Sequence, residues 1–397
     1  MNKLFTIFYF ILFLAYPGHN AILPLFEQKI KSEIKADSTT SVTLTFVGDL
    51  MCHSVQYNYA RVGKDSFDFE PVYRYVKEFL SEPDFMIGNL ETVIGGKKAG
   101  YSGYPFFNSP DEYVSALKTA GFDFLTTANN HSLDRGEAGV LRTIEILKQN
   151  EIMYNGTYST QADRDSLRII DTDNIRIAML AYTYGTNGVK IPNDKDYLIN
   201  LIDYKKIEAD IFKAKTLGVD IVLVHFHFGE EYKREPDSFQ KEVVNKTIQF
   251  GADIIIGGHP HVIQPIDYFQ SDKSKLDSVF VAYSLGNFVS NQRWRYSDAG
   301  AILNIIIEKN ISGKVQLKEI NYLPTWVFKG NTGTKNEYLI LPSDRYSDTT
   351  LTFLKLTDRR LMQQSLEDTK EIFMKYSRIN IKSSFTETIL TGENYGN

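Results

Sequence analysis

Five short clusters of polar side chains punctuate this sequence, and each directly follows an apolar run typical of a buried strand. Four of the clusters contain six of the chain's seven histidines, namely His53, His131, His225, His227, His259 and His261. The fifth cluster, after the run at 84–87, ends in the carboxylate of Glu91. Ligand sites in α/β sheets form beyond the carboxyl ends of the strands, and histidine, carboxylate and amide groups are ligands of divalent metals. The sequence therefore predicts an α/β protein with a metal centre.

Composition and charge narrow the classes of partner. The chain of 397 residues is 43% hydrophobic and 23% charged, as in globular proteins, and its net charge is -5. Lysine and arginine form no long basic run. A duplex nucleic-acid surface needs a basic face, so we expect no nucleic-acid partner.

The N-terminus predicts export. Lys3 precedes an apolar stretch at 4–16, which is the layout of a secretory signal peptide. We assign residues 1–20 to the signal peptide and 21–40 to a linker, and expect a periplasmic or cell-surface protein. The stretch is shorter than the roughly 20 residues that span a bilayer, although an uncleaved signal anchor stays open as the alternative. The only cysteine, Cys52, can form no internal disulfide and is predicted to be a small buried residue.

Apolar runs and helix-ending signals define the expected organisation. Prolines at first-turn positions and glycines after helix ends predict helices, which we place at 71–80, 110–120, 137–150, 204–217 and 237–250. Beyond Pro265 the pattern favours antiparallel strands, at 279–283, 301–307 and 315–322, followed by a helix at 357–376. We expect one main domain at 41–325 and a C-terminal extension at 326–397.

Six segments, in order along the chain, resemble the CapA, or poly-gamma-glutamate capsule biosynthesis, family of the calcineurin-like metallophosphoesterase fold group. They are residues 48–51, 89–91, 128–136, 227–232, 258–261 and 284–288. The resemblance covers about residues 42–307 and implies a bacterial, cell-surface setting. It also implies a four-layer αββα sandwich with the metal cleft between the loop ends of its two sheets. With the last helix, we expect this metallophosphatase-like sandwich to carry a C-terminal helical appendage.

The resemblance assigns roles to individual residues. One or two divalent transition ions (Mn, Fe or Zn) would bind through Asp49, Glu91, Asn130, His227, His259 and His261, with Glu91 in the bridging position. His131 corresponds to the residue that protonates the leaving group. Arg135 is a candidate for clamping a phosphate or carboxylate, with structural pairing at Asp134 or a helix end as the alternative.

The sequence leaves alternative roles for three further residues, His225, Glu231 and His53. His225 alternates with His227 on a strand, so both face the same side, and His225 is either a ligand or a supporting core histidine. Glu231 either orients a ligand histidine or lies on a charged surface. Met51 stands where the fold group usually has a histidine, and His53 could replace that ligand if the turn is bulged or helical.

Two functions fit these patterns. The first is an exported metal-dependent hydrolase that acts on a phosphoester or amide in capsule or surface-polymer biosynthesis, with an anionic polymer or a phosphoester as substrate. The alternative is a non-catalytic scaffold in a membrane-associated polymer synthase assembly.

Overall fold

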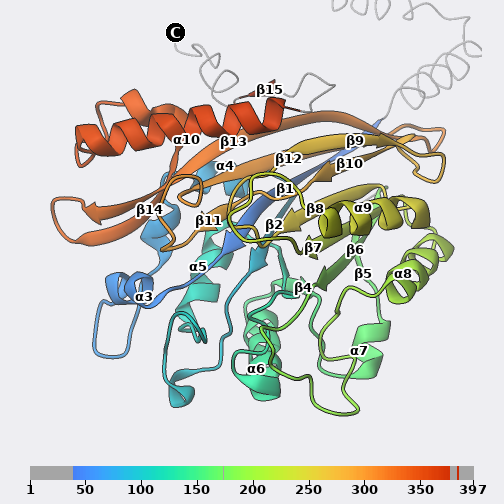
Figure 1. Cartoon of the computed structure of the whole chain (residues 1–397), viewed down its shortest axis with the longest axis horizontal. Coiled ribbons are helices and arrows are strands. Elements are labelled where there is room, and N and C mark those ends of the chain that lie inside the picture. The colour runs from blue at the N-terminus through green and yellow to red at the C-terminus, as the bar shows by residue number, and fades with distance from the viewer. Residues whose placement is uncertain (1–38, 173, 376–381, 384–397) are drawn as a thin grey trace, which may run out of the picture.

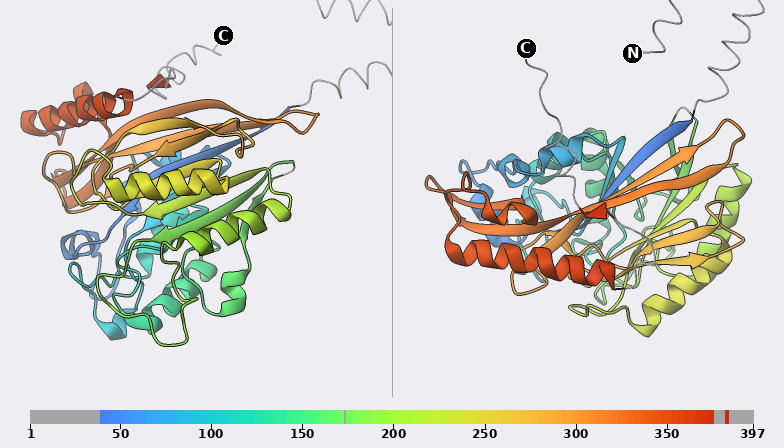
Figure 2. Two further views of the ribbon diagram at one scale, coloured as in Figure 1. Left: turned by 45° about the vertical axis from the view of Figure 1, so that its right-hand side comes forward. Right: turned by 90° about the horizontal axis from the view of Figure 1, so that it is seen from above.

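Two β-sheets lie face to face, with helices on both outer sides (Figure 1, Figure 2). This computed structural model describes residues 39–172, 174–375 and 382–383. The predicted signal peptide at 1–20 and nearly all of the predicted linker at 21–40 lie outside the described residues. None of the described helices is both long enough and apolar enough to cross a membrane.

The first sheet has nine strands in the order β14-β13-β12-β1-β2-β3-β4, with β11 beside β1 and β15 beside β13. Strands β1 to β4 run parallel, whereas β12, β13 and β14 are antiparallel. Their bounds are β1 Thr40–Leu50, β2 Phe85–Leu90, β3 Phe124–Thr126, β4 Met153–Asn155, β11 Asn287–Val289, β12 Ala299–Lys309, β13 Val315–Asn331, β14 Asn336–Pro342 and β15 Lys382–Ser383.

The second sheet has six strands in the order β5-β6-β7-β8-β10-β9. Its four central strands are parallel, and the edge strands β5 and β9 are antiparallel to their neighbours. Their bounds are β5 Arg168–Asp171, β6 Arg176–Thr183, β7 Ile221–His227, β8 Ile254–Gly258, β9 Ile266–Gln270 and β10 Ser278–Ala282.

Alternating apolar side chains build the core between the sheets. Leu44 and Phe46 of β1 pack in one buried cluster with Met179 of β6 and Leu223 of β7, because alternate residues of a strand share a face. The outer face of the first sheet is covered by α5 (Glu112–Ala120) and α6 (Gly136–Gln149), and that of the second by α8 (Tyr204–Thr216) and α9 (Ser238–Phe250). The expected αββα sandwich is confirmed.

The predicted helices agree with the structure except at one place. Instead of a helix at 71–80, the chain forms the 3-10 turn η1 (Glu70–Tyr73) and the short helix α4 (Lys77–Ser81). The backbone of Val76, at φ -122° and ψ -3°, interrupts them. Short elements that the sequence did not predict are α3 Ser54–Ala60, η2 Lys97–Ala99, α7 Gln161–Asp165 and η3 Ser343–Ser347.

The C-terminal helix α10 (Leu356–Met374) is present and lies along β13 (Figure 1). Met362 of α10 packs in a cluster with Trp326, Leu339 and Leu341 of β13 and β14. The boundary placed between residues 325 and 326 falls inside β13, which pairs continuously with β12 and β14. The first sheet therefore continues through that boundary into the extension.

Candidate metal centre

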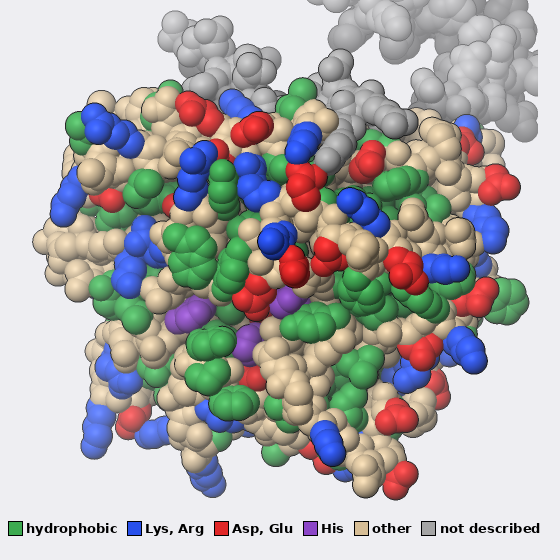
Figure 3. Space-filling model, viewed as in Figure 1, with side chains coloured by type: hydrophobic (Ala, Val, Ile, Leu, Met, Phe, Trp, Pro, Cys, Tyr) green, Lys and Arg blue, Asp and Glu red, His purple; other side chains and the backbone are tan. Residues whose placement is uncertain are grey.

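The polar clusters meet where the parallel strands of both sheets end. Asp49 ends β1, Glu91 follows β2 and Asn130 follows β3, all in the first sheet. The second sheet contributes His227 at the end of β7, and His259 and His261 after β8. All six side chains are buried, yet histidine side chains reach the face shown in Figure 3, where hydrophobic and acidic side chains lie beside them.

Asp49 joins the two sheets. Its carboxylate accepts hydrogen bonds from Asn89 Nδ2 at 2.8 Å and from the backbone N–H of His259 at 3.2 Å. Its Oδ2 also lies 3.3 Å from His261 Nδ1. Burial alone would raise the pKa of Asp49, but the His261 imidazole and the Asn89 amide outweigh it and hold this pKa below its ordinary value. Asp49 is therefore a fixed negative charge in the cleft.

Glu91 is the residue that most strongly indicates a cation. Both of its carboxylate oxygens are buried, and neither has a hydrogen-bond partner among the described residues. Its Oε1 lies 3.5 Å from His227 Nε2 and 3.7 Å from His261 Nε2. Burial and the neighbouring charge of Asp49 raise the pKa of Glu91 to about 8. An uncompensated buried carboxylate is costly unless it is paired or coordinates a metal, so its surroundings fit a divalent ion.

Within the described part of the chain, three overlapping groups of side chains could each hold a metal ion. They are Glu91 with His227 and His259, Asp49 with Glu91 and His261, and Glu231 with His259 and His261. In each group the ligand atoms all lie within 4.8 Å of one another. The first two groups share Glu91, as expected of a carboxylate that bridges two ions. The donor set of imidazoles and carboxylates fits a divalent transition metal.

The histidines differ in charge. Burial lowers the pKa of His227 to about 3 and that of His259 well below its ordinary value, so both imidazoles are neutral, as metal ligands must be. Burial opposes the charge of His261 too, but the carboxylates of Glu91 and Asp49 outweigh it and raise the pKa of His261 to about 9. His259 and His261 both have left-handed backbones, at φ 95° and φ 57°. Strained conformations of this kind cluster at functional sites.

Asn130 and His131 have separate tasks. Asn130 Oδ1 lies 2.9 Å from His227 Nε2, inside the ligand cluster. The ring of His131 is instead held by Asp134, whose Oδ2 lies 2.8 Å from His131 Nδ1, and by the edge of Phe107 at 4.6 Å between centroids. Asp134 Oδ2 also accepts the backbone N–H of Phe107 at 2.7 Å. The Nε2 of His131 is therefore the nitrogen left for proton exchange.

The structure does not bring His53 or His225 into the three ligand groups. His53 Nδ1 lies 3.1 Å from Gln56 Oε1 and accepts the backbone N–H of Asn291 at 3.3 Å, while its ring meets the edge of Phe107 at 5.1 Å. His225 is buried, its Nδ1 has no hydrogen-bond partner among the described residues, and burial lowers its pKa to about 3.

Arg135 bonds a loop rather than the ligand cluster. It stands at the N-cap of α6, and its Nη2 donates to the Ser102 hydroxyl and to the carbonyl of Phe106. These contacts give Arg135 a structural role in the loop at 102–106, although its partners are neither Asp134 nor a helix end. Glu231 belongs to one ligand-capable group, although its side chain is exposed.

Four residues that the sequence did not assign to the site surround the ligands. Asn89 donates to Asp49, Asn287 Oδ1 lies 3.1 Å from His261 Nδ1, and the rings of Tyr184 and Tyr232 lie 4.6 Å from His259 and 6.1 Å from His261, respectively. Asn89 and Asn287 lie in the motif segments, so closer attention to amides there could have found them. Tyr184 directly follows β6, a strand that the sequence analysis did not name.

Two Bacillus proteins are similar in sequence to this chain. The PGA biosynthesis protein CapA of Bacillus subtilis (strain 168) is 29% identical over 303 residues, which are 73% of this chain and 74% of that protein. The capsule biosynthesis protein CapA of Bacillus anthracis is 29% identical over 296 residues, 72% of this chain and 69% of that protein.

Similar solved structures include two nucleotidases. The NAD nucleotidase of Haemophilus influenzae is 12% identical with a TM-score of 0.46, and the match covers 89% of this chain and 66% of that one. A putative 5'-nucleotidase from Staphylococcus aureus is also 12% identical with a TM-score of 0.46, and the match covers 83% of this chain and 58% of that one.

The family model described as bacterial capsule synthesis protein PGA_cap matches residues 43–292, which include every candidate ligand. The chain therefore belongs to the bacterial capsule synthesis protein PGA_cap family.

Proposed function

We propose that this capsule-synthesis family member is a metal-dependent hydrolase that cleaves a phosphoester or an amide bond during assembly of a bacterial surface polymer. The observation that carries the proposal is the buried carboxylate of Glu91, which has no hydrogen-bond partner for either oxygen within the described part of the chain. Three imidazoles and a second carboxylate surround it. A group this costly to bury is retained where it binds a cation.

The metal ligands would be Asp49, Glu91, Asn130, His227, His259 and His261. A bound divalent ion would supply Lewis-acid polarisation of the scissile group and activation of water. Asn89 and Asn287 hold Asp49 and His261 in place through their side-chain amides. Such supporting hydrogen bonds fix the orientation of metal ligands.

His131 would donate the proton to the leaving group. Asp134 holds its Nδ1, and the ring edge of Phe107 fixes its plane, so the ring presents Nε2. A hydrogen bond at Nδ1 also fixes the orientation of the imidazole, as a positioned general acid requires.

The substrate and the cellular setting are also part of the proposal. The names of the two Bacillus relatives, for PGA and capsule biosynthesis, support a polymer-related substrate, either a phosphoester or an anionic polymer such as poly-gamma-glutamate. We extend this to export, and to action beside a membrane-associated polymer synthase. In the competing proposal the same cleft binds metal, and the chain acts as a non-catalytic scaffold.

Hydrolysis by the metal-loaded full chain tests the proposal. The probes are bis-p-nitrophenyl phosphate for phosphoesters and γ-glutamyl-p-nitroanilide for amides, each measured with and without chelator. We expect chelator-sensitive hydrolysis of at least one probe. In His131→Ala we expect full metal content and a rate about 10²–10⁴-fold lower, which is the usual contribution of a general acid.

His53→Ala is the matched control, because His53 meets the same Phe107 ring but lies outside the ligand groups. It should keep both metal and activity, and a large loss of rate there would identify His53 as the acid instead. A metal-replete wild type that hydrolyses neither probe would favour the scaffold. A metal-free His131→Ala would make His131 a ligand.

A further inference from the structure

Exposed aromatic rings lie against the candidate ligand histidines and against one another. Tyr184 lies over His259, at 4.6 Å between ring centroids, and Tyr232 lies 6.1 Å from His261. Trp294 meets Tyr232 at 5.1 Å with the rings at 64°. Tyr104 lies three residues before Phe107, whose ring contacts that of His131. These rings are exposed although they are large and apolar, with 51% of Trp294 and 74% of Tyr104 open to solvent. We call Tyr104, Tyr184, Tyr232 and Trp294 the aromatic rim.

The rim is acidic rather than basic. Tyr232 directly follows two exposed carboxylates, Glu230 and Glu231, in the same loop. Glu231 also approaches His259 and His261 as a ligand-capable group. A polyanionic chain that crossed this rim would meet the exposed carboxylate of Glu231, and like charges at close range are unfavourable.

The basic residues of loops 229–236 and 291–298, which carry Tyr232 and Trp294, already have partners. Lys233 Nζ lies 3.8 Å from Glu230, and Arg293 Nε donates to the carbonyl of Val327 at 3.2 Å. The other two, Arg234 and Arg295, both bind Asp368 of α10. Arg234 donates to its carbonyl at 2.6 Å, and Arg295 grips its carboxylate at 3.1 and 2.9 Å.

Helix α10 thus joins the two loops that carry Tyr232 and Trp294. The guanidinium groups of Arg234 and Arg295 also lie over Tyr296, at 4.3 and 4.8 Å from its ring centroid. Lys375, just after α10, forms a further ion pair with Glu235 of the first loop. Trp294 and α10 both lie beyond residue 292, where the match to the family model ends.

We propose that the aromatic rim binds a sugar ring next to the reacting phosphate of the substrate, and that α10 positions Tyr232 and Trp294 for this through Asp368. The ligand class is a sugar phosphate. A pyranose has apolar C–H faces that pack on aromatic rings, and hydroxyl groups that Gln292 and Glu231 can bind. Gln292 already donates to the Tyr232 hydroxyl at 3.1 Å. The phosphate belongs to the metal cleft, so the inference rests on the proposed function.

Trp294 offers a direct readout. The chain has two tryptophans, and Trp326 is fully buried whereas Trp294 is half exposed. The metal-loaded full chain is titrated with glucose 1-phosphate, N-acetylglucosamine 1-phosphate and glucose 6-phosphate, and with glycerol 3-phosphate, which has no ring. Intrinsic fluorescence and calorimetry give Kd, and KM replaces Kd for any ligand that is hydrolysed.

We expect at least one sugar phosphate to bind more tightly than glycerol 3-phosphate and to change the Trp294 emission. Trp294→Ala should weaken that sugar phosphate by about three- to tenfold and leave glycerol 3-phosphate unchanged. Trp294→Phe should restore the affinity, because it keeps a ring. Phe212→Ala is the control for an exposed aromatic side chain, since 72% of Phe212 on α8 is open to solvent.

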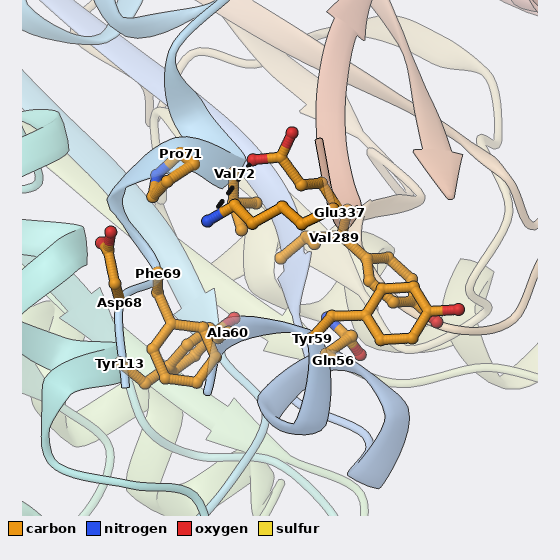
Figure 4. A pocket seen from close by; sticks show the side chains of 12 residues that line it. Gln56, Tyr59, Ala60, Asp68, Phe69, Pro71, Val72, Tyr113, Val289 and Glu337 are labelled. Atoms are coloured by element: carbon orange, nitrogen blue, oxygen red, sulfur yellow. Dashed lines mark ion pairs between the residues drawn. The ribbon is translucent and has the colours of Figure 1, made fainter. Parts of the chain in front are cut away.

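The role of α10 is tested with Asp368→Asn. This change should raise KM or Kd for the sugar phosphate, leave kcat nearly unchanged and make Trp294 easier to quench with acrylamide. Glu337→Gln is the matched control, because Glu337 forms an equally bidentate pair with Arg74, at 3.1 and 3.0 Å. Glu337 lines a small pocket formed by residues around α3, η1 and β14, where a second ion pair joins it to Lys335 (Figure 4).

Equal affinity for all four ligands would overturn the inference, as would unchanged sugar-phosphate binding in Trp294→Ala. Tighter binding of a γ-linked glutamate hexapeptide that depends on Trp294 would overturn the ligand class. An Asp368→Asn variant that behaves like Glu337→Gln would remove α10 from the proposal. Hydrolysis without a preference for sugar phosphates would leave the proposed function standing and refute this inference. Selective binding of a sugar phosphate without any hydrolysis would support this inference and refute the proposed function.

Discussion

The two strand-end edges that meet in the cleft differ in chemistry. The first sheet contributes oxygen donors from Asp49, Glu91 and Asn130, and the second contributes imidazoles from residues 227, 259 and 261. Each of the three ligand-capable groups combines carboxylate and imidazole donors. The two groups that contain Glu91 therefore form only where the two sheets bring their loop ends together, whereas the group of Glu231, His259 and His261 lies in loops of the second sheet alone.

Burial shifts the pKa values of Glu91, on the first edge, and His227, on the second edge, in opposite directions. Burial raises the pKa of Glu91 and lowers that of His227, so each edge alone favours neutral side chains. Only across the edges do charges support one another, where Asp49 and Glu91 raise the pKa of His261 to about 9. A cation between Glu91 and the neutral imidazoles would offset the remaining free-energy cost of burying the ionised Glu91 carboxylate.

Removing the imidazole edge should have the largest effect. We expect the double variant His259→Ala with His261→Ala to lose nearly all bound metal after dialysis, because all three ligand groups include at least one of these residues. Elemental analysis by mass spectrometry measures this directly. His53→Ala should keep its metal. Unchanged metal stoichiometry in the double variant would contradict the assignment of the centre.

The oxygen-bearing edge should also carry the proton donor. Asp134→Asn keeps the shape beside His131 but removes the charge that holds its Nδ1. We expect kcat to fall by about 10- to 100-fold, less than for loss of His131 itself, with metal content unchanged. Steady-state kinetics on the better probe measures it. A fall in metal content alongside activity would instead place His131 among the ligands.

Much of this arrangement could be predicted from local sequence, because strand-end placement is a local property. A polar cluster after an apolar run must lie at a sheet edge, and the parallel strands of one sheet end on the same side. Strand-end placement therefore predicted an α/β protein with a metal centre, and the family resemblance implied the αββα sandwich and the six ligand candidates that the structure brings together. Periodicity cannot identify three-residue strands such as β4 and β11.

Side-chain direction and long-range packing were not predictable in the same way. His53 lies four residues after Asp49, but its ring turns towards Phe107 and its Nδ1 towards Asn291. Arg135 binds the loop at Ser102, 33 residues earlier in the chain. The contact of Asp368 with the rim loops joins residues 73 positions apart. None of these contacts leaves a periodic signal in the sequence.

Gly258→Ala tests the close approach of Gly258 in the second sheet to Asp49 in the first sheet. A Cβ there would lie 2.7 Å from Asp49 Oδ1, too close for an ordinary contact. Asp49 would have to move away from Asn89 and from the cleft, so we expect metal affinity to fall by about tenfold. Competition with a chelating dye measures it. Gly185→Ala is the control, because nothing lies within 4 Å of a Cβ at Gly185. Equal affinity in both variants would show that the edges have room to adjust.

The smallest effect expected concerns the pH dependence of the metal-free protein. The pKa of Glu91 rises from 4.5 to about 8 on folding, so the folded state retains a proton that the unfolded state loses between those values. The stabilising effect of that proton is fully present below pH 4.5 and is lost as the pH rises to about 8. His261, raised from 6.5 to about 9, changes stability in the same direction.

Glu91→Gln should therefore flatten the decline in melting temperature of the metal-free chain between pH 5 and 8, by roughly a few degrees. Differential scanning calorimetry in the presence of chelator gives the comparison with wild type. Part of the decline should persist in the variant, because Asp49 still contacts His261. Identical slopes in the two proteins would mean that Glu91 is already ionised in the folded, metal-free state, and would imply that solvent, rather than a cation, compensates its charge.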